Sequence, residues 1–291
     1  MSAKHPIIAV TGSSGAGTTT VKLAFEHMFR RMNIKAGIVE GDSFHKYDRL
    51  AMKDFITQHE NDRYPPSHFG EDANLFDKLE ELFKHYGETG SGEVRKYLHN
   101  EEEAAPYKQD PGTFTPWEPL EKDTDVLFYE GLHGGVVTKN SNVAQHVDLL
   151  IGVVPIVNLE WIQKIHRDTH ARGYDTEMVT DTILRRMYDY VHVITPQFSR
   201  TDINFQRVST VDTSNPFIAR DIPTPDESLA VIRFRGEYAK KADFPYLLRM
   251  LDRSWMSRPN TIVVTGGKMG MAVEIILPSL IDELMSKKKQ A

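Results

Sequence analysis

A glycine-rich segment near the start of the chain has the spacing of a phosphate-binding loop. The apolar run 6–10 leads into residues 12–17, which contain three glycines, and then into Thr18 and Thr19. This pattern matches the motif G-x-x-x-x-G-K-[ST], except that Thr18 takes the lysine position. Glycines let backbone N–H groups turn toward a phosphate, and the N-terminus of the following helix adds positive charge. We therefore expect a loop that binds a polyphosphate.

The whole loop and the start of the helix are candidate positions for binding nucleotide phosphates. These positions are Gly12, Ser13, Ser14, Gly15, Ala16, Gly17, Thr18, Thr19 and Thr20. The hydroxyl of Thr19 stands where it would also coordinate a nucleotide-bound Mg²⁺. An ordinary glycine-rich turn would show the same glycines, so the hypothesis needs support from other parts of the chain.

Acidic residues at two predicted strand ends give that support. Asp42 ends one predicted strand, and Glu130 lies at the end of another. Ligand sites of open α/β sheets lie at the carboxyl ends of strands, where Glu130 would hold or orient Mg²⁺. If the segment after Asp42 is helical, His45 and Arg49 share one face beside this carboxylate. The sequence then predicts a carboxylate, an imidazole and a guanidinium in one place.

A basic segment follows in the second half of the chain. Lys164, Arg167 and Arg172 lie close together in residues 164–174, with Asp168 among them. Such a segment could close over phosphates, exclude water and supply the cation that the loop lacks. A solvated helix end would carry the same cations. The phosphate loop upstream favours the binding role.

These three parts together predict an ATP-dependent kinase. Phosphoryl transfer depends mostly on positioning and on stabilising the developing charge. Asp42 is the candidate general base for the acceptor hydroxyl, and Lys164 is the candidate catalytic cation. ATP and Mg²⁺ are the expected cofactors.

Alternating strand and helix patterns must position these residues. Strands are predicted at 35–42, 125–131, 148–155, 229–234 and 261–264, with an extended segment at 208–211. Helices are predicted from the loop to residue 33, at 158–165, at 176–191, and in a closing helix that continues past Pro278. Residues 50–86 read as a helical excursion, and 94–99 as a short strand. The pattern predicts an α/β fold with a lid and peripheral insertions.

The composition excludes several classes of protein. The 291 residues are expected to form one large domain, 1–291. With 35 Lys+Arg against 41 Asp+Glu, nucleic-acid binding is not expected. The lack of cysteine excludes disulfides and thiolate metal sites. Neither a signal peptide nor a membrane-spanning run is found, so we expect a cytoplasmic protein without membrane contact.

Five sequence blocks resemble bacterial phosphoribulokinases. They are residues 12–19, 40–45, 128–134, 158–168 and 201–207, in the family's order across almost the whole chain. The resemblance implies a P-loop kinase with an adenylate-kinase-like mixed sheet flanked by helices. Threonine at the loop lysine position also occurs in the bacterial branch, so it does not indicate inactivity.

The resemblance implies a reaction and residue roles. ATP with Mg²⁺ would phosphorylate D-ribulose 5-phosphate to D-ribulose 1,5-bisphosphate, a step of the Calvin cycle. The matching positions are Asp42 as catalytic base, Asp168 and Glu130 as further carboxylates, His45 and Arg49 as sugar-phosphate contacts, and Lys164, Arg167 and Arg172 as the basic segment. Bacterial relatives are typically homo-octamers activated by NADH. Near the effector positions lie Arg31, Arg186, Arg233 and Arg258.

Alternative functions remain open at this point. A uridine-kinase-like enzyme or another pentose-phosphate kinase would use the same scaffold with a different acceptor. A GTP-dependent switch would need an Asn- or Thr-Lys-x-Asp motif, to which residues 240–243 are the nearest match. A nucleotide-binding regulatory protein would bind without transferring a phosphoryl group.

Overall fold

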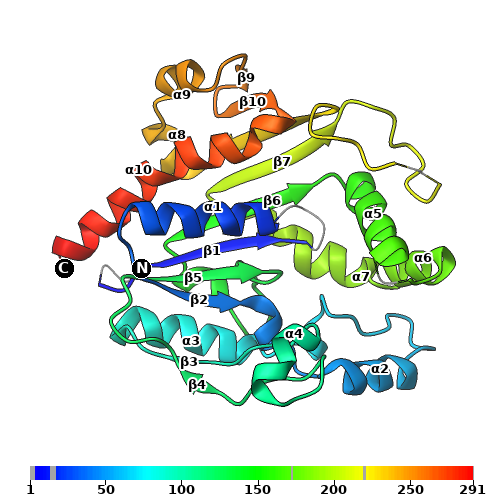
Figure 1. The fold of residues 1–291 in the computed structure, drawn as a ribbon. Coiled ribbons are helices and arrows are strands. Elements are labelled where there is room, and N and C mark those ends of the chain that lie inside the picture. Colours follow the sequence, from blue (N-terminus) through cyan, green and yellow to red (C-terminus); the bar gives the residue numbers. More distant parts are fainter. Residues whose placement is uncertain (1–3, 14–17, 172, 219–220, 291) are drawn as a thin grey trace.

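An eight-stranded mixed sheet runs through the computed structural model, which describes residues 4–13, 18–171, 173–218 and 221–290. The strand order is β2-β5-β1-β6-β7-β8-β10-β9 (Figure 1). The strands are β1 (Ile7–Gly12), β2 (Ala36–Glu40), β5 (Val126–Gly131), β6 (Leu149–Pro155), β7 (Ile203–Ser209), β8 (Ser228–Phe234), β9 (Trp255–Arg258) and β10 (Thr261–Thr265). The pairs from β2 to β7 are parallel, and those from β7 to β9 are antiparallel. The expected α/β class with a mixed sheet is therefore confirmed.

The helices cover both faces of this sheet. Their bounds are α1 (Thr18–Arg31), α2 (Arg49–Gln58), α3 (Phe76–Thr89), α4 (Glu101–Ala104), α5 (Val157–His166), α6 (Thr176–Arg185), α7 (Met187–Asp189), α8 (Gly236–Lys241), α9 (Phe244–Met250) and α10 (Met269–Gln290). A separate hairpin of β3 (Glu93–Val94) and β4 (Glu118–Pro119) lies beside α3 (Figure 1). Within the described residues, no helix combines the length and apolar character that crossing a membrane requires.

Two apolar layers hold the sheet. On one face, Phe25 of α1 and Ile276 of α10 pack against Phe128 and neighbouring strand residues. On the other face, α3 packs Phe83 against Tyr129, their ring centroids 5.5 Å apart. Phe128 and Tyr129 point to opposite faces because successive strand side chains alternate. Both faces of the parallel part are thus buried, as the apolar strand runs indicate.

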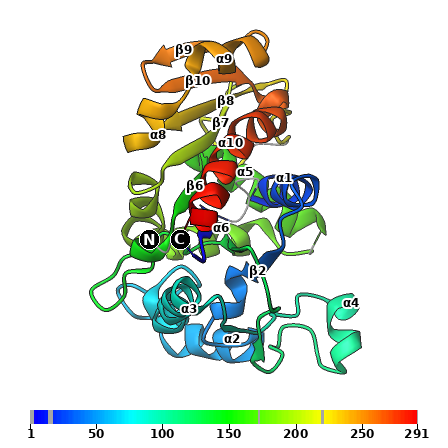
Figure 2. The ribbon, with the colours of Figure 1, turned by 90° about the vertical axis from the view of Figure 1, so that its left-hand side faces the viewer.

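The carboxyl ends of the parallel strands define one end of the molecule. In Figure 1 these strands finish on the side of α5 and α6, while both chain termini lie at the opposite end. Figure 2 views the molecule from that opposite end and shows the termini close together. Every candidate residue on a strand end therefore belongs to the same edge of the sheet.

Several predicted elements differ from the observed ones. The predicted helix 176–191 is divided into α6, α7 and a π-helical turn at Tyr190–Ile194. The extended segment predicted at 208–211 lies earlier, as β7, in which Ile203 and Phe205 are buried and alternate with polar residues. In the predicted strand 94–99, Val94 pairs within β3 and Tyr97 forms an isolated bridge to Phe114, and α8, α9 and β9 were not predicted. Most of these elements are short, so they give little periodicity by which a sequence pattern could find them.

Candidate active site

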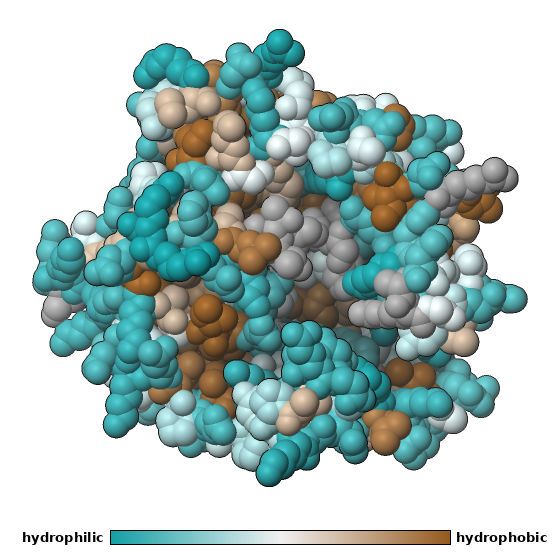
Figure 3. Space-filling view, viewed as in Figure 1, coloured by the Kyte–Doolittle hydropathy of each residue, from teal (hydrophilic) through white to brown (hydrophobic). Residues whose placement is uncertain are grey.

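A cleft of about 1060 Å³ runs along β2 and reaches the carboxyl ends of β2 and β5. Its lining includes Gly12 of the phosphate loop, Asp42 after β2 and Glu130 of β5. His99 and Tyr97, from the long insertion between α3 and β5, line the same cleft. The space-filling surface is hollowed toward this end of the sheet (Figure 3). The sheet edge thus brings together the loop and both predicted carboxylates.

Close backbone contact places the ends of β2 and β5 side by side. A Cβ atom on Gly41 would lie 2.9 Å from the Cα of Gly131, and one on Gly131 would lie 2.7 Å from the Cα of Gly41. Only glycine permits this approach. The chain then turns at once through a short 3₁₀ helix, Gly41–Phe44, that holds Asp42 at the cleft.

Two imidazoles face the carboxylate of Asp42. The Nε2 atom of His45 lies 3.2 Å from Oδ1, and the Nε2 atom of His99 lies 3.7 Å from Oδ2. Burial favours the protonated form of Asp42, but contact with His45 and the nearby imidazole of His99 outweigh it and lower the pKa of Asp42 to about 2. The carboxylate is therefore ionised at any physiological pH.

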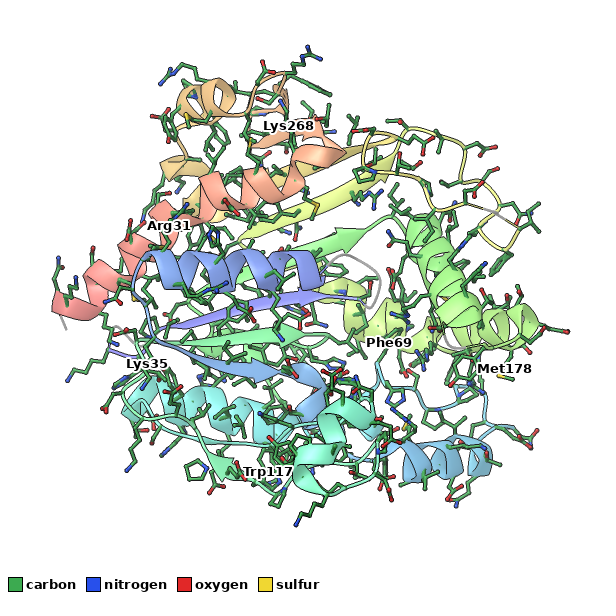
Figure 4. The ribbon with its side chains drawn as sticks, viewed as in Figure 1. Arg31, Lys35, Phe69, Trp117, Met178 and Lys268 are labelled. Atoms are coloured by element: carbon green, nitrogen blue, oxygen red, sulfur yellow. The ribbon has the colours of Figure 1, made fainter. Side chains whose placement is uncertain are left out.

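Two further histidines stand behind this pair. The ring of His68 lies 4.9 Å from that of His45, and the Nε2 atom of His133 lies 3.1 Å from the carbonyl oxygen of Phe69. Burial lowers the pKa of both His68 and His133 to about 3, so both are neutral near pH 7. Figure 4 labels Phe69 at the end of the molecule where the parallel strands finish.

Arg49 does not share a helical face with His45. His45 lies in extended backbone after the 3₁₀ helix, and Arg49 begins the separate helix α2. The shared-face prediction was wrong because Asp48 caps a new helix, its side chain accepting a hydrogen bond from the N–H of Ala51 at 2.8 Å. Arg49 still reaches the site, since its Nη2 donates to the carbonyl oxygen of His99 at 2.8 Å.

Arg95 holds this part of the site together. Its Nε donates to the carbonyl oxygen of Ser43 at 2.8 Å, and its Nη2 donates to that of His45 at 2.6 Å. Its guanidinium lies 3.7 Å from the ring centre of Phe114. The residue therefore fastens the β3 hairpin to the turn that carries Asp42.

Glu130 lies in a charged group at the end of the sheet. It pairs in register with Glu40 of β2, and Lys22 of α1 forms an ion pair with Glu40. Burial opposes the charge on Lys22, but Glu40 and Glu130 together raise its pKa. Lys22 lies in α1, about one helical turn after the phosphate loop. It therefore places a cation beside these two carboxylates.

The basic segment forms its own ion-pair group. Asp168 is almost fully buried and pairs with Lys164 and with the Nε of Arg167 at 3.0 Å. Burial lowers the pKa of Lys164, and pairing with Asp168 acts against it. Asp168 lies in a π-helical stretch, Arg167–Ala171, that directly follows α5. Short π-helical stretches are frequent at functional sites.

Arg186 lies between the two groups. Its positive charge lowers the pKa values of both His68 and Lys164, which places it within electrostatic reach of each. Its guanidinium also lies 5.5 Å from the ring centre of Phe69. The histidines around Asp42 and the basic segment therefore face one region of the molecule.

Some predicted site residues lie outside the described residues. Gly12 ends β1, and Ser13, which follows the strand, is fully buried. Ser14, Gly15, Ala16, Gly17 and Arg172 are not described, and the bounds of α1 begin at Thr18. Their predicted roles, and those of the Thr18, Thr19 and Thr20 side chains, stay predictions.

Sequence patterns missed several residues of the site. His68, His99, His133 and Arg95 come from the insertion and from loops, where no periodicity marks them. The nearest match to a guanine motif has a structural role instead: Lys240 pairs with Glu237, and the side chain of Asp243 caps α9. That observation removes the support for a GTP-dependent switch.

Comparison with known proteins gives the family. The model of the phosphoribulokinase / uridine kinase family matches residues 7–214. The chain belongs to this family. It is 61% identical over 292 residues to the chromosomal phosphoribulokinase of Cupriavidus necator, with 100% of this chain and 99% of the relative covered.

Other members agree over their full length. The chain is 60% identical to the probable phosphoribulokinase of Escherichia coli over 289 residues, 99% of each protein. The solved structure of the phosphoribulokinase from Rhodobacter spheroides superposes with a TM-score of 0.91 at 54% identity, covering 99% of this chain and 100% of the other. The resemblance to bacterial phosphoribulokinases is confirmed.

Proposed function

We propose that the chain transfers the γ-phosphoryl group of ATP to D-ribulose 5-phosphate by in-line attack, with Asp42 as the general base. Full-length identity of about 60% to several phosphoribulokinases supports the reaction and its acceptor. The chain is thus an ATP-dependent kinase that acts on an alcohol group of a sugar phosphate. The observation that carries the role of Asp42 is an ionised carboxylate in the cleft, beside the end of the phosphate loop.

Asp42 would accept the proton of the attacking hydroxyl. Proton transfer is late in a loose phosphoryl-transfer reaction, so the base must above all be ionised and correctly placed. His45 and Arg49 would hold the sugar phosphate near it. Lys164, Arg167 and Arg172 would stabilise the charge on the transferred group, with Asp168 orienting the first two.

The residues present fit a nucleotide-bound Mg²⁺. Mg²⁺ usually binds to one or two carboxylates together with phosphate oxygens and waters. Among the described residues no group of three or more histidine or acidic side chains could hold a metal alone, as expected when phosphate completes the coordination. Glu130, with the hydroxyl of Thr19, would hold the ion, which neutralises charge on the transferred phosphoryl group.

We also propose an assembly, an effector and a location. The enzyme would be a single-domain subunit of a homo-oligomer, an octamer by analogy with its family, and would act in the cytoplasm. NADH is the proposed effector: a second cleft of about 440 Å³, lined by Arg233 and Arg258, offers cationic side chains for its phosphates. Mass photometry and the assay below, run with and without NADH, test these statements.

An ADP-release assay tests the reaction. ATP and Mg²⁺ are supplied with ribulose 5-phosphate, ribose 5-phosphate, xylulose 5-phosphate or uridine. We expect ribulose 5-phosphate to be preferred by at least 100-fold in kcat/KM, which is about 3 kcal/mol of transition-state discrimination. Equal or greater turnover of uridine would overturn the acceptor, and ATP binding without any turnover would overturn the enzyme.

A further inference from the structure

Asn74 is a buried amide that contacts the histidine beside Asp42. Its Nδ2 donates to the carbonyl oxygens of Gly70 at 2.6 Å and His68 at 3.0 Å. Its Oδ1 lies 2.8 Å from the Nδ1 of His45. Both N–H groups of this amide therefore donate to main-chain carbonyl oxygens.

These contacts decide which way the amide points. If its oxygen and nitrogen were exchanged, the oxygen would face the carbonyl oxygens of Gly70 and His68, which cannot donate. Only the observed orientation satisfies them. Because Oδ1 can only accept, the Nδ1 atom of His45 must carry a proton.

The other nitrogen of His45 faces a carboxylate. A neutral imidazole with its proton on Nδ1 has a lone pair on Nε2. That lone pair would lie 3.2 Å from Oδ1 of the ionised Asp42, an unfavourable contact. The contact becomes attractive only when Nε2 also carries a proton, that is, when His45 is an imidazolium.

We propose that Asn74 is a positioning residue that keeps His45 protonated on Nδ1 and so maintains an imidazolium against Asp42. The Oδ1 atom of Asp42 is then engaged by this cation, while Oδ2, which has the Nε2 atom of His99 3.7 Å away, would accept from the acceptor hydroxyl. The proton of the hydroxyl goes to Oδ2 as the bond from the hydroxyl oxygen to the γ-phosphorus forms, while the bond from that phosphorus to the β–γ bridging oxygen breaks and ADP leaves. This role of Asn74 rests on the proposed role of Asp42 as the base.

The backbone around Asn74 suits a positioning role. The N–H of Leu75 donates to the carbonyl oxygen of Phe44, and that of Lys46 donates to Ala73, both at 2.8 Å. These bonds bracket a β-bridge between His45 and Asn74. The amide and the imidazole are thus fixed by main-chain pairing on both sides, 29 residues apart in the sequence.

The other groups around His45 do not supply an alternative acceptor for Nδ1. His68 is neutral and lies ring to ring at 4.9 Å, and the ring of Tyr97 lies at 6.3 Å. The guanidinium of Arg95 contacts the carbonyl oxygen of His45 rather than its ring. The Nε2 atom of His99 lies near Oδ2, the other carboxylate oxygen of Asp42.

Histidine ¹⁵N NMR of the intact enzyme tests the protonation directly. Protein labelled with [¹⁵N]histidine is compared with the His45→Gln variant, whose missing signal assigns His45. At pH 7 we expect both ring nitrogens of His45 to be protonated, and Nδ1 to stay protonated when the imidazolium finally loses a proton at higher pH. An unprotonated Nδ1 of His45 at any pH between 6 and 9 would overturn the proposal.

A pair of variants separates this effect from loss of structure. Asn74→Ala removes the acceptor, while Ser67→Ala removes the hydrogen bond from Ser67 to Asp189, 2.6 Å long, in the same loop. We expect Asn74→Ala to shift the His45 signal to a neutral ring and to lower kcat at least tenfold, with KM for ATP changed less than twofold. Ser67→Ala should keep the wild-type signal and kcat.

Each remaining outcome has a meaning. An unchanged His45 signal in Asn74→Ala, or the same change in Ser67→Ala, would contradict a specific role for Asn74. If Asn74→Ala does not fold, the wild-type spectrum still decides whether Nδ1 of His45 carries a proton. If Asp42→Asn keeps full activity, the base is misassigned, yet the His45 signal still reports whether Asn74 sets its protonation.

Discussion

At the scale of single residues, burial divides the histidines of the site into two kinds. His68 and His133 are held neutral by burial, since their pKa values are lowered to about 3. His45 is also buried, but it contacts the carboxylate of Asp42. Burial thus holds His68 and His133 neutral, whereas His45 is the buried imidazole that meets a carboxylate.

Replacing Asp42 by asparagine removes the proposed base with little change in shape. We expect kcat to fall about 10²–10⁴-fold, the usual contribution of a general base. Binding of ATP, measured by isothermal titration calorimetry, should change less than threefold, because the phosphate loop is untouched. Retention of more than a tenth of the wild-type kcat would contradict this role.

Replacing Lys164 by methionine tests the cation of the basic segment. The change removes the cation proposed to act on the transferred group and one ion pair of Asp168, whose pair with Arg167 stays. We expect kcat to fall about 10²-fold or more, as for loss of one group that stabilises the transition state. Lys164→Arg should recover part of kcat. Lys289→Met, on the exposed end of α10, is the control and should behave as wild type in the same ADP-release assay.

At the scale of elements, one aspartate fastens the start of β7, the strand at which the sheet changes from parallel to antiparallel pairing, to β6. The Oδ2 atom of Asp202 accepts from the N–H of Leu150 at 2.8 Å, just before β7. Burial raises the pKa of Asp202 to about 6, and the bond from Leu150 and the charge of Arg235 act against it. The fold therefore favours the protonated form of this side chain.

The raised pKa predicts a specific dependence of stability on pH. Folding binds a proton at Asp202 between the unfolded pKa near 3.9 and the folded pKa near 6, so this group stabilises the fold less as pH rises through that window. Asp202→Asn still accepts from Leu150 and cannot ionise. We expect its free energy of unfolding, relative to wild type, to increase by about 1–3 kcal/mol from pH 4 to pH 7.

Urea unfolding at both pH values measures this difference. Asp226→Asn, at an exposed aspartate, serves as the control and should show the same pH dependence as wild type. A relative stability of Asp202→Asn that stays flat or decreases from pH 4 to pH 7 would contradict the prediction.

At the scale of the whole molecule, the core is continuous from the first strand to the last helix. The apolar layer that contains Phe25 of α1 also contains Ile232 of β8 and Leu277 of α10. The N-terminal and C-terminal halves thus share one buried surface. This arrangement supports the proposal that residues 1–291 form a single domain.

A single cooperative unfolding transition is the expected consequence. In calorimetry at neutral pH without ligands we expect one peak, and Leu277→Ala should shift the whole peak rather than part of it. The cost of this core truncation is about 2–5 kcal/mol. Two resolved peaks, or a shift confined to one of them, would show that the halves unfold separately.

The sequence by itself determined the fold class and the main strands in their order along the chain, and it singled out the phosphate-loop spacing and the carboxylates Asp42 and Glu130 as candidates. These features are local: an apolar run, a glycine spacing and a charge at a strand end follow one another along the chain. Even Pro278 did not obscure the closing helix, which continues through it. The resemblance to a kinase family rests on the same contiguous blocks.

The tertiary structure alone decided the surroundings of Asp42. His99, Arg95 and Asn74 reach the carboxylate or its partner His45 from an insertion and a distant loop. Nothing in their local sequence marks them, because their positions depend on long-range pairing. The contact of His45 with the amide of Asn74 joins residues 29 positions apart, a property of packing that spacing along the chain does not encode.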